Sequence, residues 1–267
     1  MNRNKGVQRL SLFTIFMTLT VLACQGVSAL NPFATATPTP TLTFTATPTV
    51  TPSPTPTSTP TFTPTATPPP TGRLTEEQPD GTTLFTDYDG KYQVTFPEGW
   101  TVVILDEEYI DAALDRLPEQ ERGVADMIKS VKNADVNELI RVVGFNFGAQ
   151  EGPYAPNINI SYDTNPLSAR ISLKDLIDST VAYFPSLNIE VVNTEIKATS
   201  SGIEIGVIEA RWSMNATGGQ RINLHQKQVF FKSGKGVVII TFSTVKGAAV
   251  DLSADLEEII ESIKLLN

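Results

Sequence analysis

Apolar residues along this chain form short clusters separated by polar segments rich in glycine, proline, serine and threonine. In the C-terminal third, four clusters at residues 189–198, 203–214, 222–232 and 237–245 have the length of strands. The links between them are short, polar and glycine-containing, which favours an antiparallel meander. Residues 237–240 are apolar at consecutive positions, so this strand is expected to be covered on both faces. The apolar phase shifts near Val207-Ile208, which predicts either a bulge or burial on both sides.

Four more strands are expected before this meander. Residues 91–96 and 100–105 are short apolar runs on either side of Pro97-Glu98-Gly99, and this arrangement predicts a hairpin. Strands are also expected at 139–147 and 157–162. In the latter, Ile158, Ile160 and Tyr162 alternate with polar residues, so one face of the strand should be wet.

Helical spacing of apolar residues appears in three regions. Residues 110–117 and 118–132 predict two helices that meet at Pro118. Ser172 and Asp175 form a capping box that opens a helix with Leu173, Leu176, Ile177, Val181 and Phe184 on its inner face. The chain ends with an amphipathic helix whose inner stripe is Leu252, Leu256, Ile259, Ile260 and Ile263. Strands and helices together indicate the α+β class.

The N-terminus has the features of an export signal. Arg3, Lys5 and Arg9 precede an uncharged apolar stretch at residues 10–23, which is short for a membrane span and typical of a signal-peptide core. The stretch ends in Val21-Leu22-Ala23-Cys24, which resembles a bacterial lipobox, and Cys24 is the only cysteine. We therefore expect cleavage before Cys24 and lipid attachment at Cys24. The alternative is cleavage after Ala29, which would release a secreted protein.

These patterns divide the chain into three parts, with a signal peptide at 1–23, a stalk at 24–72 and a globular domain at 73–267. No charged residue or histidine occurs from residue 10 to residue 72, and residues 35–71 form a tract rich in threonine and proline. Such a tract lacks the apolar side chains of a core and favours extended polyproline II, typical of a disordered spacer. Tracts of this composition also resemble O-glycosylated stalks.

The charge balance bears on the partners of the domain. Three of the 20 basic residues lie in the leader, which leaves 17 against 29 acidic residues and a net charge of −12. An acidic surface repels phosphate backbones and anionic lipid headgroups. We therefore expect no nucleic-acid partner and contact with the membrane only through the lipid.

Two segments resemble those of the PsbP-like family, which includes the Mog-type proteins. They are KYQVTFPEGW at residues 91–100 and LEEIIESIKLL at residues 256–266. The resemblance implies a central antiparallel sheet with helices on both faces, an α/β/α sandwich. Members of this family are mostly binding or assembly proteins. The matching segments are structural, so the resemblance transfers no site residue and no partner.

Candidate chemistry within the domain is weak. His225, the only histidine, should share one strand face with Asn223 and Lys227, with Ile222 and Leu224 on the other face. A Ser-His-Asp triad could form only through this histidine, and a lipidated Cys24 excludes both a Cys-His pair and a zinc site of histidine and cysteine. We interpret His225 as an exposed strand residue without a catalytic role.

The remaining candidates involve acidic residues and a sequon. Several carboxylates crowd one predicted helix start and could bind a divalent cation, but a solvated helix face is the better interpretation. They are Asp106, Glu107, Glu108, Asp111 and Asp115. Asp87-Tyr88-Asp89-Gly90 resembles a fragment of a calcium loop but lacks the later ligands, so a turn is expected. Asn215-Ala216-Thr217 fits an N-glycosylation sequon, which bacterial export leaves unmodified.

The sequence as a whole predicts a lipid-anchored protein on the extracytoplasmic face of a cell membrane. Its PsbP-like domain should act by binding or assembly with an unknown protein or envelope component. We expect no enzymatic activity, no catalytic residues, no cofactor and no metal. The alternative is a cell-surface hydrolase that uses carboxylates, because 29 acidic residues always offer pairs.

Overall fold

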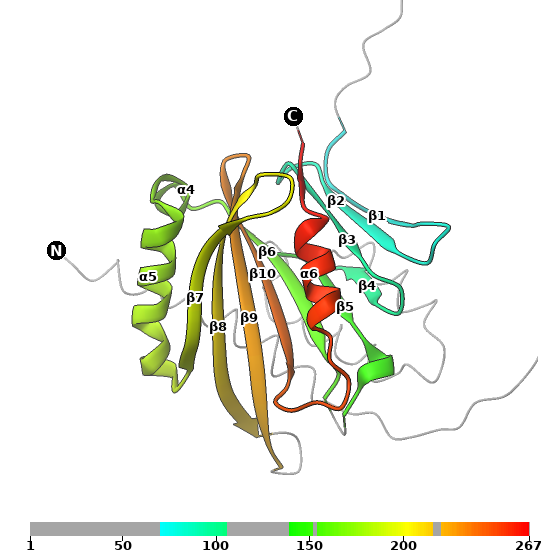
Figure 1. Cartoon of the computed structure of the whole chain (residues 1–267). Helices are drawn as coiled ribbons and strands as arrows, with labels where there is room; N and C mark the ends of the chain where they lie inside the picture. Colours follow the sequence, from blue (N-terminus) through cyan, green and yellow to red (C-terminus); the bar gives the residue numbers. More distant parts are fainter. Residues whose placement is uncertain (1–69, 106–138, 152–153, 216–219, 267) are drawn as a thin grey trace, which may run out of the picture. The chain divides into compact units, whose positions relative to one another are not determined.

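A computed structural model describes residues 70–105, 139–151, 154–215 and 220–266 (Figure 1). Its main element is a seven-stranded antiparallel sheet in the order β4-β5-β6-β10-β9-β8-β7. These strands are β4 Thr101–Ile104, β5 Ile140–Phe145, β6 Asn157–Asp163, β7 Glu190–Ala198, β8 Glu204–Asn215, β9 Arg221–Ser233 and β10 Gly236–Val245. The last four pair with their neighbours in the chain, so the predicted antiparallel meander is confirmed.

A second sheet of four strands has the order β1-β2-β3-β11. Its strands are β1 Arg73–Glu77, β2 Thr83–Asp87, β3 Tyr92–Phe96 and β11 Lys264–Leu265. The predicted hairpin between residues 91–96 and 100–105 is wrong, because β3 pairs with β2 and β11 whereas β4 pairs with β5. Phe96 and Trp100, on either side of the turn, are both buried in one core. At this turn the chain passes from the second sheet to the central sheet, with both rings buried between them.

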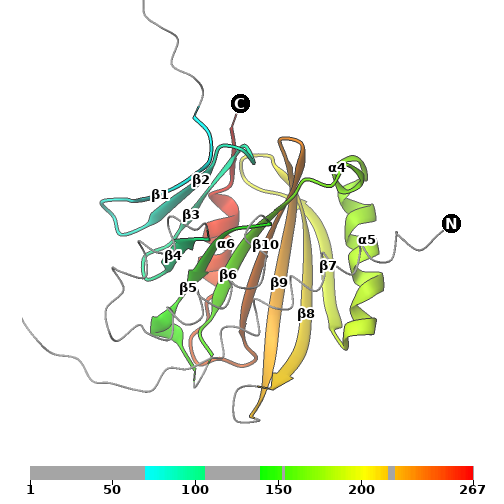
Figure 2. The same cartoon turned by 180° about the vertical axis from the view of Figure 1, so that it is seen from behind.

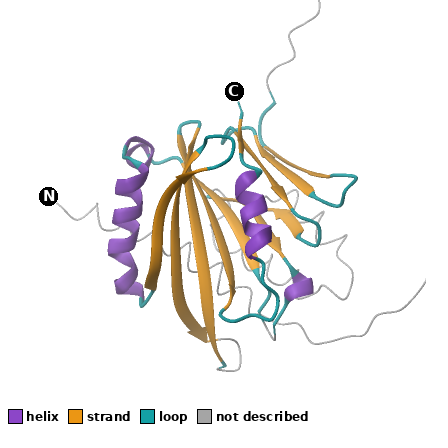
Figure 3. Cartoon of the chain, viewed as in Figure 1, coloured by secondary structure: helices purple, strands orange, loops and turns teal. Residues whose placement is uncertain are grey.

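Of the described α-helices, the two longer ones were predicted from the sequence, whereas the short helix before the Ser172 cap was not (Figure 3). The short helix α4, Pro166–Arg170, leads to α5, Leu173–Tyr183, and α6, Ser253–Glu261, is followed by β11, so the chain does not end in the helix as predicted. The side chain of Ser172 accepts a hydrogen bond from Asp175 N at 3.1 Å, so the predicted cap of α5 is confirmed. Two 3-10 turns, η2 Phe147–Ala149 and η3 Phe184–Leu187, complete the described elements. Among the described helices, none is long and apolar enough to cross a membrane.

The central sheet carries a hydrophobic core on each face. One core joins the sheet to α6 and to the second sheet, through residues such as Phe96, Ile240 and Ile260. The other joins it to α5, through residues such as Ile177 and Ile208. Helix α6 lies in front of the central strands in Figure 1 and behind them in Figure 2. The fold class is therefore confirmed as α+β, with helices on both faces of a central antiparallel sheet.

Burial of the strands matches the sequence pattern in two cases and differs in a third. Residues 237–241 of β10 are at most 3% exposed, which confirms that this strand is covered on both faces. Gly206, Val207 and Ile208 of β8 are buried without a register shift against β9, so the shift in apolar phase reflects burial on both sides. In β6, however, every residue is buried, and the predicted wet face is wrong. The helices expected at 110–132 lie outside the described residues.

Candidate functional site

A cavity of about 370 Å³ opens where the chain passes from β10 to α6, and we call it the His225 cavity. Strands β8, β9 and β10 contribute one side, and residues 247–253 with the first turn of α6 contribute the other. Strands β8 and β9 bring polar side chains, whereas Phe242 of β10 and the leucines at the start of α6 are apolar. The cavity therefore has a charged end and an apolar wall.

The charged end is built by the register of β8 and β9. Arg211 pairs with His225 and Glu209 pairs with Lys227, so Glu209 and His225 are diagonal neighbours on one face. The Nε2 atom of His225 lies 2.7 Å from Oε1 of Glu209, and the two side chains are 34% and 26% exposed. The sequence placed His225 correctly on the face with Asn223 and Lys227. It predicted a simply exposed residue, and the structure corrects this to a half-buried pair with Glu209.

The apolar wall consists of Phe242 from β10, Leu252 and Leu256 at the start of α6, and Val250 at the rim. The first three are at most 7% exposed, whereas Val250 is 46% exposed. The ring of Phe242 packs against Trp100, with centroids 6.3 Å apart. A fixed wall with one exposed apolar residue at its mouth suits the apolar part of a small ligand.

Hydrogen bonds fix the start of α6 beside this wall. Asp251 accepts from Ser253 N at 2.9 Å and from Ser253 Oγ at 2.6 Å, and these bonds lower the pKa of Asp251. One turn later, Trp100 Nε1 donates to Asp255 Oδ2 at 2.8 Å. Glu257 of α6 lies 3.4 Å from the ammonium of Lys197 and 3.5 Å from that of Lys227. The helix is thus held to the central sheet and to Trp100, which lies between β3 and β4, around the cavity.

This arrangement favours recognition over nucleophilic catalysis. Ser253 also lines the cavity, but its hydroxyl donates to Asp251, so its hydrogen is not directed at His225. The His225–Glu209 pair can exchange hydrogen bonds with a polar ligand group, because imidazole offers a donor or an acceptor at each ring nitrogen. The chemistry available is a hydrogen-bonding end beside an apolar wall.

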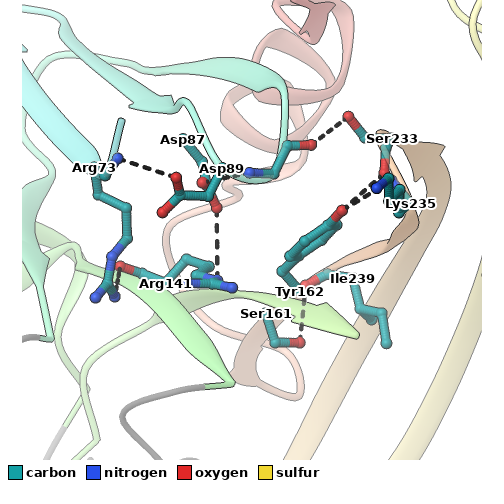
Figure 4. Close-up of polar contacts among 11 residues, drawn as sticks. Arg73, Asp87, Asp89, Arg141, Ser161, Tyr162, Ser233, Lys235 and Ile239 are labelled. Carbon is teal, nitrogen blue, oxygen red and sulfur yellow. Dashed lines mark hydrogen bonds and ion pairs between the residues drawn. The ribbon is translucent and has the colours of Figure 1, made fainter. Parts of the chain in front are cut away.

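A second polar cluster lies between the two sheets (Figure 4). Asp87 of β2 is fully buried, and its Oδ2 atom lies 3.6 Å from Nε of Arg141 on β5. Asp87 also accepts from Gly90 N at 2.7 Å, so it forms the β2–β3 turn as well as the ion pair. The Arg141 guanidinium stands over the ring of Tyr162, 5.3 Å from its centroid. The sequence predicted the turn at Asp87 but not its burial.

Burial controls the titration of this cluster. Loss of hydration raises the pKa of Asp87, and the Gly90 hydrogen bond and Arg141 offset part of that rise. The pKa of Tyr92 is raised well above its ordinary value, first by burial and then by the nearby Asp87 charge. Ser233 Oγ donates to Gly90 O at 2.7 Å and Tyr162 Oη donates to Ser233 O at 3.1 Å, tying the same turn to the central sheet. We interpret the cluster as a structural junction.

A row of neutral polar side chains is buried on the α5 side of the central sheet. Register places Thr241 between Asn159 and Gln228, and Ser243 between Asn157 and Gln226. All six of these residues are at most 6% exposed. Within the described residues, Asn159 Nδ2, Thr241 Oγ1 and Ser243 Oγ have no hydrogen-bond partner. This row explains why the alternation in β6 did not indicate a wet face.

Most of the other candidate residues from the sequence lie outside the residues that the structure describes. Cys24 and the carboxylates at 106–115 lie outside the described residues, as do two of the three sequon residues. Over the described ranges, no group of three or more histidine, cysteine, aspartate or glutamate side chains is placed to hold a metal ion. Sequence reasoning missed Glu209, although counting back from the glycine-containing link between the strands predicted at 203–214 and 222–232 would have placed it near His225.

Comparison with known proteins gives similarity to solved structures only. No protein-family model matches the chain, and no curated protein matches it. The structure is similar to the solution structure of cyanobacterial PsbP from Synechocystis sp. PCC 6803, with 14% identity and a TM-score of 0.45 over 70% of this chain and 94% of that one. It is also similar to LpqN, described as involved in cell envelope biogenesis of Mycobacterium tuberculosis, with 12% identity and a TM-score of 0.39 over 73% and 91% of the two chains. With TM-scores this low, neither similarity carries an argument about function.

Proposed function

We propose that this chain is an exported, lipid-anchored protein that acts by binding a ligand or envelope component in the His225 cavity. The lipobox-like junction at Cys24 and the threonine-proline tract support display on the extracytoplasmic side of a membrane. The cavity carries the binding part of the proposal. At about 370 Å³, its size is that of a small-molecule site.

The lining of the cavity indicates what kind of group it would receive. A ligand with an apolar body would cover Val250 and pack against Phe242, Leu252 and Leu256. Its polar end would meet the His225–Glu209 pair on β8 and β9. One side belongs to regular strands, and hydrogen bonds from Ser253 to Asp251 fix the start of α6 on the other, so little ordering of these parts is needed on binding, which favours affinity.

Photocrosslinking in intact envelopes tests binding at this cavity. A benzoylphenylalanine residue replaces Val250 at the cavity rim, and the matched control replaces Leu167, which is 68% exposed on α4. We expect a discrete product from position 250 only. His225→Ala should weaken it by about tenfold or more, because a charge-assisted hydrogen bond contributes on the order of 1.5–3 kcal/mol. Identical products from positions 250 and 167 would contradict the proposal.

The anchor has its own test. Cys24→Ser removes the only thiol, so the chain should partition into the aqueous phase after detergent phase separation or persist as a longer precursor. The measurement is phase partitioning together with the intact mass of the mature chain. A lipid-modified mature chain in the Cys24→Ser variant would show that the lipid is attached elsewhere.

The second candidate is a carboxylate-dependent hydrolase. It is favoured by one observation, that Glu209 and Asp251 line the same cavity. This function predicts turnover of p-nitrophenyl glycosides or esters by the purified chain, with loss of turnover in Glu209→Gln. Crosslinking at position 250 without turnover of these probes supports binding instead.

A further inference from the structure

Two adjoining cavities lie on the same sheet face, beyond the His225 cavity and away from α6. Their volumes are about 310 and 330 Å³, and both are lined by Arg221, Asn223 and Lys246. Arg211 and Glu190 line the first of them, and Glu151 lines the second. Because they share three side chains, we treat them as one feature and call it the Arg221 groove.

The strand register explains why cations gather here. On β8 and β9, Arg211 pairs with His225, Ser213 with Asn223, and Asn215 with Arg221. Successive pairs two residues apart point to the same face, spaced about 7 Å along the strands. Lys246 follows β10, and its backbone N–H donates to Asn223 O at 2.8 Å, which places it in the Ser213–Asn223 row. Arg221 on β9 and Lys246 just after β10 therefore lie in neighbouring rows. Arg211 on β8 lies in the next row, on the other side of the row that contains Lys246.

The three cations have no ionic partner within the described part of the chain. The ion pairs found there involve Arg141, Lys174, Lys197, His225 and Lys227. Glu190 and Glu151 line the groove but form no ion pair with its cations, and Glu151 accepts a hydrogen bond from Ala249 N. These three cations gather around one hollow in a domain of net charge −12, where carboxylates greatly outnumber cations.

A hydrogen-bond chain also orients the groove. The Nη2 atom of Arg221 donates to Ser213 Oγ at 3.3 Å, and Ser213 Oγ donates to Asn223 Oδ1 at 2.7 Å. This leaves the remaining guanidinium N–H groups of Arg221 available, in the fork that fits a carboxylate or phosphate. The orientation is set before a ligand arrives, which lowers the entropic cost of binding.

We propose that the Arg221 groove binds a small ligand that carries two acidic groups, one held by Arg221 with Lys246 and the other by Arg211. The site is separate from the His225 cavity and does not depend on the function proposed for it. The net charge of −12 repels long polyanions, so the fitting ligand is a compact dianion. Carboxylate and phosphate share the required chemistry, and the test below distinguishes them.

Isothermal titration of the purified full chain measures this binding. The probes are succinate for carboxylates, pyrophosphate for phosphates, acetate as a single-charge comparison, and phosphatidylglycerol vesicles for a lipid headgroup. We expect succinate or pyrophosphate to bind more tightly than acetate, with affinity falling as sodium chloride rises. Binding of the phosphate probe without the carboxylate probe identifies the acidic groups as phosphates, and the reverse result identifies them as carboxylates. Binding of the vesicles alone, or of no probe, would overturn the proposal.

Matched variants locate the site. Arg221→Gln and Lys246→Gln should each weaken binding of the dianion by about tenfold or more, and Arg211→Gln should reduce it toward the affinity of acetate. The control is Lys264→Gln, which removes an exposed cation from β11 in the second sheet. Equal weakening by all four variants would show that binding depends only on the net charge of the chain, and it would overturn the proposal. Crosslinking from position 250 should persist in the three groove variants, which keeps this result independent of the His225 cavity.

Discussion

Ile240→Asp is expected to cost several kcal/mol of unfolding free energy, and that is a large fraction of the roughly 5–15 kcal/mol that holds a domain folded. Ile240 is 0% exposed in the core shared with α6 and the second sheet. It lies on β10, paired with Ile160 of β6 on one side and Val229 of β9 on the other. An aspartate there loses the packing of the isoleucine and gains a buried charge without a partner.

Urea unfolding of the purified chain measures this loss, and two further variants show its cause. Ile239→Asp places the same charge on the opposite face, in the core shared with α5, where Ile239 is 3% exposed. Thr194→Asp on the exposed edge strand β7 is the control and should cost about 1 kcal/mol or less. A mild effect at either position 239 or position 240 would contradict a central strand covered on both faces.

The elements that the sequence predicted correctly are those that carry local signals. The meander β7–β10 follows from apolar runs and glycine-containing links, and α5 follows from the Ser172 cap. The stripe of α6 was read from its spacing, and all five of its residues are buried. In each case the information lies within about ten residues, which is the range in which periodicity and capping act.

The second sheet escaped prediction in two ways: β1 and β2, which pair locally, were not predicted, and the pairing of β3 with β11 joins strands that are distant in the chain. Strand β3 pairs with β11, and Thr95 N donates to Ser262 Oγ across 167 positions at 2.8 Å. Nothing near residues 91–105 indicates that contact, so the Pro97-Glu98-Gly99 turn suggested the local hairpin. The buried row in β6 was misread for a related reason. Alternation of polar and apolar residues shows which residues share a face, but it does not show whether that face meets water.

The candidate sites combine residues from several segments. Glu209 and His225 were within reach of sequence reasoning, because they flank one hairpin whose register can be counted. The apolar wall of the cavity was not, since it depends on how α6 packs against β10 and Trp100. Overall net charge was also a poor guide to local charge. The acidic total of the domain concealed the cations that the register of β8 and β9 gathers in the Arg221 groove.

Arg141→Met is expected to destabilise the chain by about 3 kcal/mol or more at neutral pH, because it leaves the carboxylate of Asp87 buried without its cation. Asp87 is 0% exposed, and the Arg141 side chain is only 15% exposed, so water replaces little of the lost interaction. Methionine retains much of the contact that the arginine makes with Tyr162. The main loss should therefore be electrostatic and not a loss of packing.

The pH dependence of this deficit shows whether the Asp87 charge is its cause. Burial raises the folded-state pKa of Asp87 above 3.8, so the folded chain binds this proton more tightly than the unfolded chain does. Stability linked to Asp87 is then largest below pH 3.8 and falls as the pH rises through the raised pKa. Removing Arg141 raises that pKa further, so the deficit of Arg141→Met relative to the native chain should be small in acid and grow toward neutrality.

The double variant Asp87→Asn/Arg141→Met separates this effect from lost packing. Asparagine keeps the oxygen that accepts from Gly90 N but carries no charge. We expect the double variant to recover most of the stability lost at neutral pH, because replacing both partners of a buried ion pair is far less costly than removing one. The stability deficit of the double variant relative to the native chain should also stay constant as the pH rises toward neutrality, whereas the deficit of Arg141→Met grows. If the double variant were as unstable as Arg141→Met at every pH, the lost packing of Arg141 against Tyr162 within the central sheet would account for the deficit, and the ion pair between the two sheets would contribute little.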